Sequence, residues 1–196
     1  METVLLEVPT DTNLAIYLAL HTGMRIGEIC AFHWSDIDWD ERLLFVRSTV
    51  IRNKKGQPVI ASPKSETSQR AIPLTRQLVN LLAAEHERSY SEFVFSSPRK
   101  DTFLNPRTLQ YRFQTLLTRL GISRISFHAL RHTFATRWIE FGMDVKSLSE
   151  VLWHAGVQIT LDIYVHSSDK LKREAIEKLE GFSGQSFGQE TAESVA

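Results

Sequence analysis

The sequence predicts a mainly helical protein with a small three-stranded antiparallel β-sheet, an α+β fold. Apolar residues recur at helical spacing along most of the 196 residues, whereas strand-forming residues gather between residues 43 and 74. Apolar residues make up 42% of the chain and charged residues 23%, a balance typical of globular domains. This composition is sufficient for a full hydrophobic core and excludes a disordered or collagen-like chain.

Two helices are predicted ahead of the sheet. Thr10 or Asp11 caps the first helix, which ends at Gly23 because glycine favours the left-handed turn that closes a helix. The second helix is expected over residues 25–34. The strands of the sheet are expected at residues 43–51, 58–60 and 70–74, with a hairpin tip at residues 53–56.

Helices dominate the remainder of the chain. Thr75 supplies a capping oxygen, and Asn105 is followed by a proline, which is favoured at the first helical position. The C-terminal sequence GFSGQSFGQETAESVA has little core-forming content, so residues 1–180 are expected to form the domain and residues 181–196 a flexible tail. The helices are expected at about residues 75–88, 106–121, 126–142, 144–154, 159–166 and 169–179.

Charge is distributed unevenly along a chain that has 23 basic and 23 acidic residues. Residues 99–137 carry eight basic residues and one acidic residue, whereas residues 1–46 carry two and eight. A basic middle segment permits an anion-binding face on a neutral protein, although an arginine-rich solvated surface would give the same pattern. We expect a cytoplasmic protein, because no apolar run approaches the roughly 18 residues of a membrane span, the acidic N-terminus is unlike a secretory signal, and the single Cys30 excludes an internal disulfide.

Several separate residues could act on an anion. Arg25 begins a helix, where backbone N–H groups and a guanidinium attract phosphate, although a surface pair with Glu28 is the simpler interpretation. Lys64 lies between two predicted strands, where it is either solvated or able to donate a proton to a substrate. Tyr164 becomes a nucleophile where cations stabilise its phenolate, but most tyrosines pack half-buried in a helix.

His128, Arg131 and His132 lie in one predicted helix. His128 and Arg131 are three residues apart, so one helix face presents a titratable group and a permanent cation to a single anion. His128 and His132 are four apart, a spacing that also holds zinc, but the zincin motif requires a glutamate where Ala129 stands. We expect His132 to be hydrogen-bonded beneath the helix.

Together these residues resemble the catalytic set of the tyrosine recombinase (phage integrase) family, which is related in chemistry to type IB topoisomerases. The resemblance rests on five ordered stretches, TGMRIGEI, PKSETSQRAIPL, HALRHTFAT, LWHAG and TLDIYVH, which span roughly residues 10–180. The sequence departs from the family pattern at Ala129, where aspartate is frequent, and at Trp153, where glycine is frequent. The Trp153 ring either reshapes the pocket beside His154 or packs outward.

The resemblance implies the catalytic domain of a site-specific DNA recombinase, which cleaves and rejoins DNA through a covalent 3′-phosphotyrosyl intermediate without metal, ATP or another cofactor. Tyr164 would attack the scissile phosphorus and Lys64 would protonate the leaving 5′-oxygen. His128 would act as the general base towards the tyrosine. The phosphate oxygens would be held by Arg25, Arg131 and His154.

The same resemblance implies double-stranded DNA as the partner of a bacterial or phage-encoded protein associated with the nucleoid. It also implies a homotetramer on DNA that exchanges C-terminal helices, with accessory DNA-bending proteins as further candidate partners. Family members usually carry an N-terminal DNA-clamping domain, which we expect to be absent here. Candidate contacts to backbone phosphates, each of which could equally be a solvated side chain, are Arg107, Arg112, Arg119 and Arg124.

Two other functions fit parts of the sequence. A non-catalytic DNA-binding regulator of recombination, derived from an integrase, would share the fold, but all six proposed catalytic residues are present. A metallohydrolase would use His128, His132 and His154. The segment HALRH lacks a carboxylate, however, and the permanent charge of Arg131 would repel a metal ion.

Overall fold

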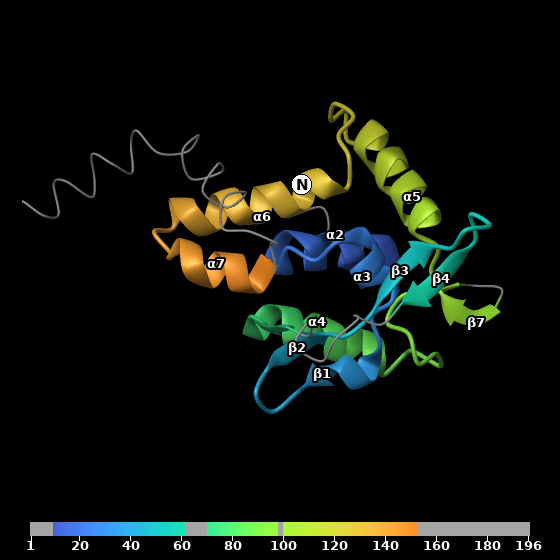
Figure 1. Ribbon diagram of the computed structural model, residues 1–196, viewed down its shortest axis with the longest axis horizontal. Coiled ribbons are helices and arrows are strands. Elements are labelled where there is room, and N and C mark those ends of the chain that lie inside the picture. Colours follow the sequence, from blue (N-terminus) through green and yellow to red (C-terminus); the bar gives the residue numbers. More distant parts are fainter. Residues whose placement is uncertain (1–9, 62–69, 98–99, 153–196) are drawn as a thin grey trace, which may run out of the picture.

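The computed structural model describes residues 10–61, 70–97 and 100–152. Helices are the predominant regular structure of this part and small antiparallel sheets accompany them, as the sequence predicts (Figure 1). Within these ranges no helix is long and apolar enough to cross a membrane. The helices predicted at residues 159–166 and 169–179 and the tail from residue 181 lie outside the described residues.

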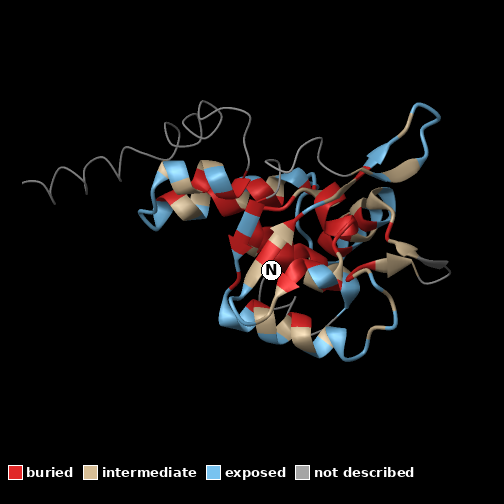
Figure 2. Ribbon diagram, turned by 60° about the horizontal axis from the view of Figure 1, so that its bottom comes forward, coloured by how far each residue is buried: buried red, intermediate tan, exposed pale blue. Residues whose placement is uncertain are grey.

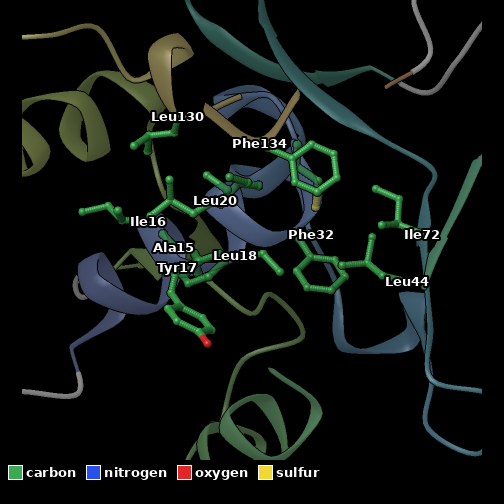
Figure 3. Close-up of a cluster of buried hydrophobic side chains, with 14 of the residues drawn as sticks. Ala15, Ile16, Tyr17, Leu18, Leu20, Phe32, Leu44, Ile72, Leu130 and Phe134 are labelled. Atoms are coloured by element: carbon green, nitrogen blue, oxygen red, sulfur yellow. The ribbon is translucent and has the colours of Figure 1, made fainter. Parts of the chain in front are cut away.

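Helix α2 (Asp11–Thr22) is the central element of the core. Thr10 caps it with a side-chain hydrogen bond and Gly23 ends it in the left-handed conformation, both as predicted. Eight of its twelve residues are buried, including six in succession, so α2 has apolar side chains on every face. Figure 3 shows labelled side chains of this helix below Leu130 of a later helix, with Phe134 of that helix and then Ile72 of the sheet to their right.

Helix α3 (Ile26–Cys30) is shorter than the helix predicted over residues 25–34. The chain leaves the helix because the next residues pair with a distant segment: the Trp34 amide donates to the carbonyl oxygen of Glu92 at 3.1 Å. A short 3₁₀ turn, η1 (Trp34–Asp36), follows. These long-range backbone bonds replace the helical ones, and the sequence pattern does not reveal them.

The predicted three-stranded antiparallel sheet is present, but its strands are not those expected. The strands are β1 (Ile37–Asp38), β2 (Leu43–Val46), β3 (Thr49–Arg52), β4 (Pro58–Ala61) and β5 (Arg70–Pro73). The three-stranded sheet has the order β1-β2-β5, while β3 and β4 form a separate hairpin. The predicted strand 43–51 divides because Ser48 donates to the Ala31 carbonyl (3.0 Å) and Arg47 to Asp36 (3.3 Å), both outside the sheet.

The later helices begin close to the predicted positions, and Thr75 and Asn105 both act as caps, whereas the short strand pair between residues 96 and 103 was not predicted. The elements are α4 (Arg76–His86), β6 (Ser96–Ser97), β7 (Lys100–Phe103), α5 (Pro106–Arg119), α6 (His128–Glu140) and α7 (Val145–Leu152). α6 packs against α2, and α7 packs against both α6 and β5. In Figure 2 the buried residues surround α2, whereas the tip of the β3–β4 hairpin is exposed.

Candidate active site

Arg131 is the most deeply buried charged residue of the described part, with 3% of its surface exposed. Its guanidinium donates to the carbonyl oxygen of Gly23 at 2.7 Å and to the carbonyl oxygen of Leu152. Gly23 is the C-cap of α2, where the last carbonyl groups of a helix lack helical partners and carry partial negative charge, and Leu152 is the last residue of α7. Arg131 is therefore held by main-chain atoms of two other helices.

Arg25 is the N-cap of α3, and 42% of its side chain is exposed. Its guanidinium donates to Glu28 Oε1 at 3.0 Å, and its backbone amide donates to Glu28 Oε2 at 2.8 Å. The simpler interpretation of the sequence, a pair with Glu28, is thus confirmed. The backbone amide of Arg25, which was expected to attract phosphate, instead donates to the Glu28 carboxylate.

Arg70, the first residue of β5, belongs to the same cluster and was missed by the sequence analysis. It is buried, with 7% of its surface exposed, and its two terminal nitrogens donate to the two oxygens of Glu28 at 3.1 and 2.7 Å. This is the bidentate geometry that arginine forms with a carboxylate. Strand alternation places Arg70 on the same inward face as Ile72, and an inward-facing arginine needs buried hydrogen-bond acceptors such as a carboxylate. That signal was available in the sequence.

Positive charge exceeds negative charge in this cluster. Burial alone would raise the pKa of Glu28, but hydrogen bonds and charges from Arg70 and Arg25 outweigh burial and hold the pKa below its ordinary value. Burial, followed by the charge of Arg25, lowers the pKa of Arg131 to about 9, so Arg131 is protonated at neutral pH. Among the described residues, three guanidiniums therefore accompany one carboxylate, and this balance suits an anionic ligand.

His128, the first residue of α6, lies near the two predicted catalytic arginines. Burial lowers the pKa of His128, and the charges of His132, Arg131 and Arg25 lower it further. Its ring lies edge-on to that of His132, with centroids 4.7 Å apart. His132 is exposed, so the expectation that it lies beneath the helix was wrong: at this end of α6 the buried face is formed by Leu130 and its helical neighbours.

Arg25, His128 and Arg131 lie close enough for their charges to interact, whereas Lys64, His154 and Tyr164 lie outside the described residues. The metallohydrolase hypothesis also depends on His154. Among the described residues, no three histidine, cysteine, aspartate or glutamate side chains are grouped as metal ligands would be.

The four candidate DNA-contacting arginines divide between two hollows. Arg107 and Arg124 line a groove of about 710 Å³ between α5 and the segment leading into α6, here named the α5–α6 groove. Arg112 and Arg119 line a second hollow of about 480 Å³ between α5 and the start of α2, here named the α2–α5 hollow. The α5–α6 groove reaches Ser126, two residues before His128, so it adjoins the candidate active site.

This fold and this arginine cluster define a class of proteins, and comparison with known families identifies it. The sequence model of the phage integrase family matches residues 4–170, and the chain belongs to that family. The predicted family is thereby confirmed.

Particular relatives are tyrosine recombinases. The tyrosine recombinase XerC-like protein of Caldanaerobacter subterraneus subsp. tengcongensis is 30% identical over 185 residues, which cover 83% of this chain and 47% of the relative. Tyrosine recombinase XerA of Pyrococcus furiosus is 30% identical over 174 residues, 87% of this chain and 56% of the relative. The chain thus spans about half the length of the curated relatives it matches.

Solved structures confirm the fold class. The Tn1549 transposon integrase in complex with transposon right end DNA superposes with a TM-score of 0.75 and 25% identity, covering 86% of this chain and 58% of that one. The crystal structure of XerA recombinase gives a TM-score of 0.68 at 24% identity, covering 90% and 61%.

Proposed function

We propose that residues 1–180 form the catalytic domain of a site-specific DNA recombinase that acts on a DNA phosphodiester. The observation that carries the proposal is the excess of positive charge around Glu28, supplied by Arg25, Arg70 and Arg131. A buried cation without a matching anion is costly, and a scissile phosphate would balance it. The named relatives are tyrosine recombinases, and one solved neighbour is bound to DNA.

The arginines stabilise the transition state because they are held in place before the substrate arrives. Arg131 is fixed by two main-chain carbonyls and Arg25 by Glu28, so neither must reorganise as negative charge develops on the phosphate oxygens. His154 adds a further hydrogen bond to the same phosphate. No resident metal is required in this scheme, since fixed side-chain cations supply the positive charge.

Cleavage joins the Tyr164 oxygen to phosphorus and breaks the bond from phosphorus to the 5′-oxygen. The lowered pKa of His128 keeps its ring neutral at pH 7, so it can accept the tyrosine proton. Lys64 donates a proton to the departing 5′-oxygen. Rejoining reverses these transfers, with the 5′-hydroxyl of a partner strand as the nucleophile.

Support for Lys64 comes from the two described ends of its segment. On one side β4 pairs with β3, and Gly27 of α3 lies so close to β3 that a Cβ atom there would be 2.6 Å from the Val50 carbonyl oxygen. On the other side Arg70 contacts Glu28 of α3. Both ends therefore lie beside the helix that Arg25 begins, within reach of a scissile phosphate.

The DNA duplex next to the scissile phosphate would lie along the α5–α6 groove, where Arg107 and Arg124 meet its backbone. The full reaction would take place in a homotetramer on DNA at the nucleoid, with exchange of C-terminal helices and help from accessory DNA-bending proteins. Deletion of residues 168–196 should abolish recombination between two sites, and unchanged recombination would exclude helix exchange.

A covalent-trapping assay tests the chemistry. Nicked suicide substrates prepared from fragments of the host replicon should yield a denaturant-resistant protein–DNA adduct, in EDTA as well as in Mg²⁺. Tyr164→Phe should yield no adduct. Tyr90→Phe, which alters an exposed tyrosine distant from Tyr164 in the sequence, should yield as much adduct as wild type. A non-catalytic regulator would bind DNA without an adduct, and a strict requirement for a divalent metal would contradict the proposed mechanism.

A further inference from the structure

We propose that Arg70 is a positioning residue for DNA cleavage, which directs Arg25 at the scissile phosphate through Glu28. This inference rests on the proposed recombinase function. It concerns a residue that contacts neither the phosphate nor the nucleophile in the scheme above.

The contacts of Glu28 give the geometric reason. Each carboxylate oxygen accepts one hydrogen bond from Arg70 and one from Arg25: Oε1 at 3.1 and 3.0 Å, and Oε2 at 2.7 and 2.8 Å. Glu28 is thus a bridge between the two arginines, and its orientation sets the direction of the hydrogen bond that it accepts from the Arg25 guanidinium.

Burial shows which end of the bridge is fixed. Arg70 is 7% exposed and its backbone pairs with Val46 in the sheet, whereas 42% of the Arg25 side chain is exposed. A planar guanidinium that bonds both oxygens also prevents the carboxylate from rotating. Arg70 therefore anchors Glu28 to the sheet, and Glu28 in turn orients the more exposed Arg25.

Arg70 also preserves the charge that Arg25 offers to a substrate. In a simple pair with Glu28, Arg25 would be neutralised and would gain little from a phosphate. Because Arg70 shares the same carboxylate, the three groups retain a net positive charge. Loss of Arg70 should thus weaken the contribution of Arg25 in two ways, by direction and by charge.

The test compares four variants in single-turnover cleavage of the suicide substrate. Arg70→Lys retains the charge but not the bidentate contact. Arg70→Met combined with Glu28→Leu replaces the buried pair by apolar side chains, a change that proteins often tolerate without loss of stability. Arg47→Met removes an arginine that follows β2 and pairs with Asp36 of η1 instead of Glu28, and it is the matched control. Arg25→Ala provides the reference defect.

Arg70→Lys and the double variant should cleave roughly tenfold to a hundredfold more slowly at saturating DNA, as expected for misplacement of a catalytic group. Their DNA affinity and unfolding temperature should stay close to those of wild type, and Arg47→Met should cleave normally. Wild-type cleavage rates in both Arg70 variants would overturn the inference. If wild type itself formed no adduct on any fragment, the proposed function would fail instead.

A neutral substrate separates positioning from a general structural defect. A methylphosphonate at the scissile position lacks the charge that Arg25 offsets, so Arg25→Ala should be less impaired on it than on phosphate. If Arg70 acts through Arg25, Arg70→Lys should recover on this substrate by a similar factor. Equal slowing of Arg70→Lys on both substrates would show that Arg70 supports folding alone.

Discussion

Replacing Gly23 by alanine should damage both the core and the candidate active site. Gly23 ends α2 with φ +64°, a conformation that residues with a side chain rarely adopt. A Cβ atom would lie 2.5 Å from Leu152 Cδ2 and 2.6 Å from Phe134 Cδ1. The added methyl group would therefore press into the contact between three helices while the backbone is also strained.

The expected loss of stability follows from these two effects. The left-handed conformation costs a non-glycine residue about 1–2 kcal/mol. Inserting a methyl group into a packed core costs about 1–3 kcal/mol more. The sum, about 2–5 kcal/mol, should lower the melting temperature of a domain of this size by roughly 5–15 °C.

Gly142→Ala is the matched control. Gly142 follows the end of α6 with φ +74°, but a Cβ atom there would meet nothing within 4 Å. It should lose only the conformational cost, about 1–2 kcal/mol. Urea unfolding of the two variants and wild type therefore isolates the clash at Gly23, and equal destabilisation of both variants would refute this reasoning.

Cleavage provides a second measurement on the same pair of variants. The Gly23 carbonyl holds the Arg131 guanidinium at 2.7 Å, so displacement of this carbonyl moves a phosphate-binding group. At a temperature where both variants are folded, Gly23→Ala should cleave the suicide substrate more slowly than Gly142→Ala. Equal rates would mean that Arg131 keeps its position without this carbonyl.

Three further predictions concern charge. His132→Asn removes the charge interaction by which His132 lowers the pKa of His128, so that pKa should rise. The acid limb of the cleavage pH profile should then move to higher pH, and an unmoved limb would contradict the assignment of His128 as the general base. Changing Arg107 and Arg124 to glutamine should make the negative slope of log DNA affinity against log salt concentration shallower by about 2. Changing Arg112 and Arg119 of the α2–α5 hollow to glutamine should leave the slope unchanged. Equal slopes for the two double variants would exclude the α5–α6 groove as the DNA path. The pKa of Glu28 in the folded protein lies below its ordinary value of 4.5, so the ionised carboxylate stabilises the fold at pH values above 4.5. In urea unfolding, the difference in free energy of unfolding between wild type and Glu28→Gln should therefore decrease as the pH falls through the folded pKa, and a difference that does not change with pH would contradict this role of Glu28.

Features set by neighbouring residues could be predicted from the sequence. Thr10, Thr75 and Asn105 cap helices through side-chain bonds to amides two or three residues ahead. The pair between Arg25 and Glu28 spans one helical turn and was also anticipated. In each case both partners lie in the same short segment, so residue type and spacing are sufficient.

The partners of distant residues could not be predicted, even where strand alternation marks a residue such as Arg70 as inward-facing. Arg70 and Glu28 are 42 positions apart, and the sheet that brings them together contains strands other than those expected. The strand expected over 43–51 breaks because Ser48 bonds to Ala31, and the strength of local β-propensity gives no sign of such a bond. Residues 43–51 do favour a strand locally, but tertiary contacts override that preference at residues 47 and 48.

The arginines of the site show two ways to hold a cation in place without cancelling its positive charge. Arg131 is held by carbonyl oxygens, which orient a guanidinium without cancelling its charge. Arg70 and Arg25 share one carboxylate, which orients both but can neutralise only one. In either arrangement the hydrogen bonds supply direction while net positive charge remains. An anion that enters this site completes an electrostatic balance that the described residues leave open, and this is the condition under which fixed charges favour a transition state that gains negative charge.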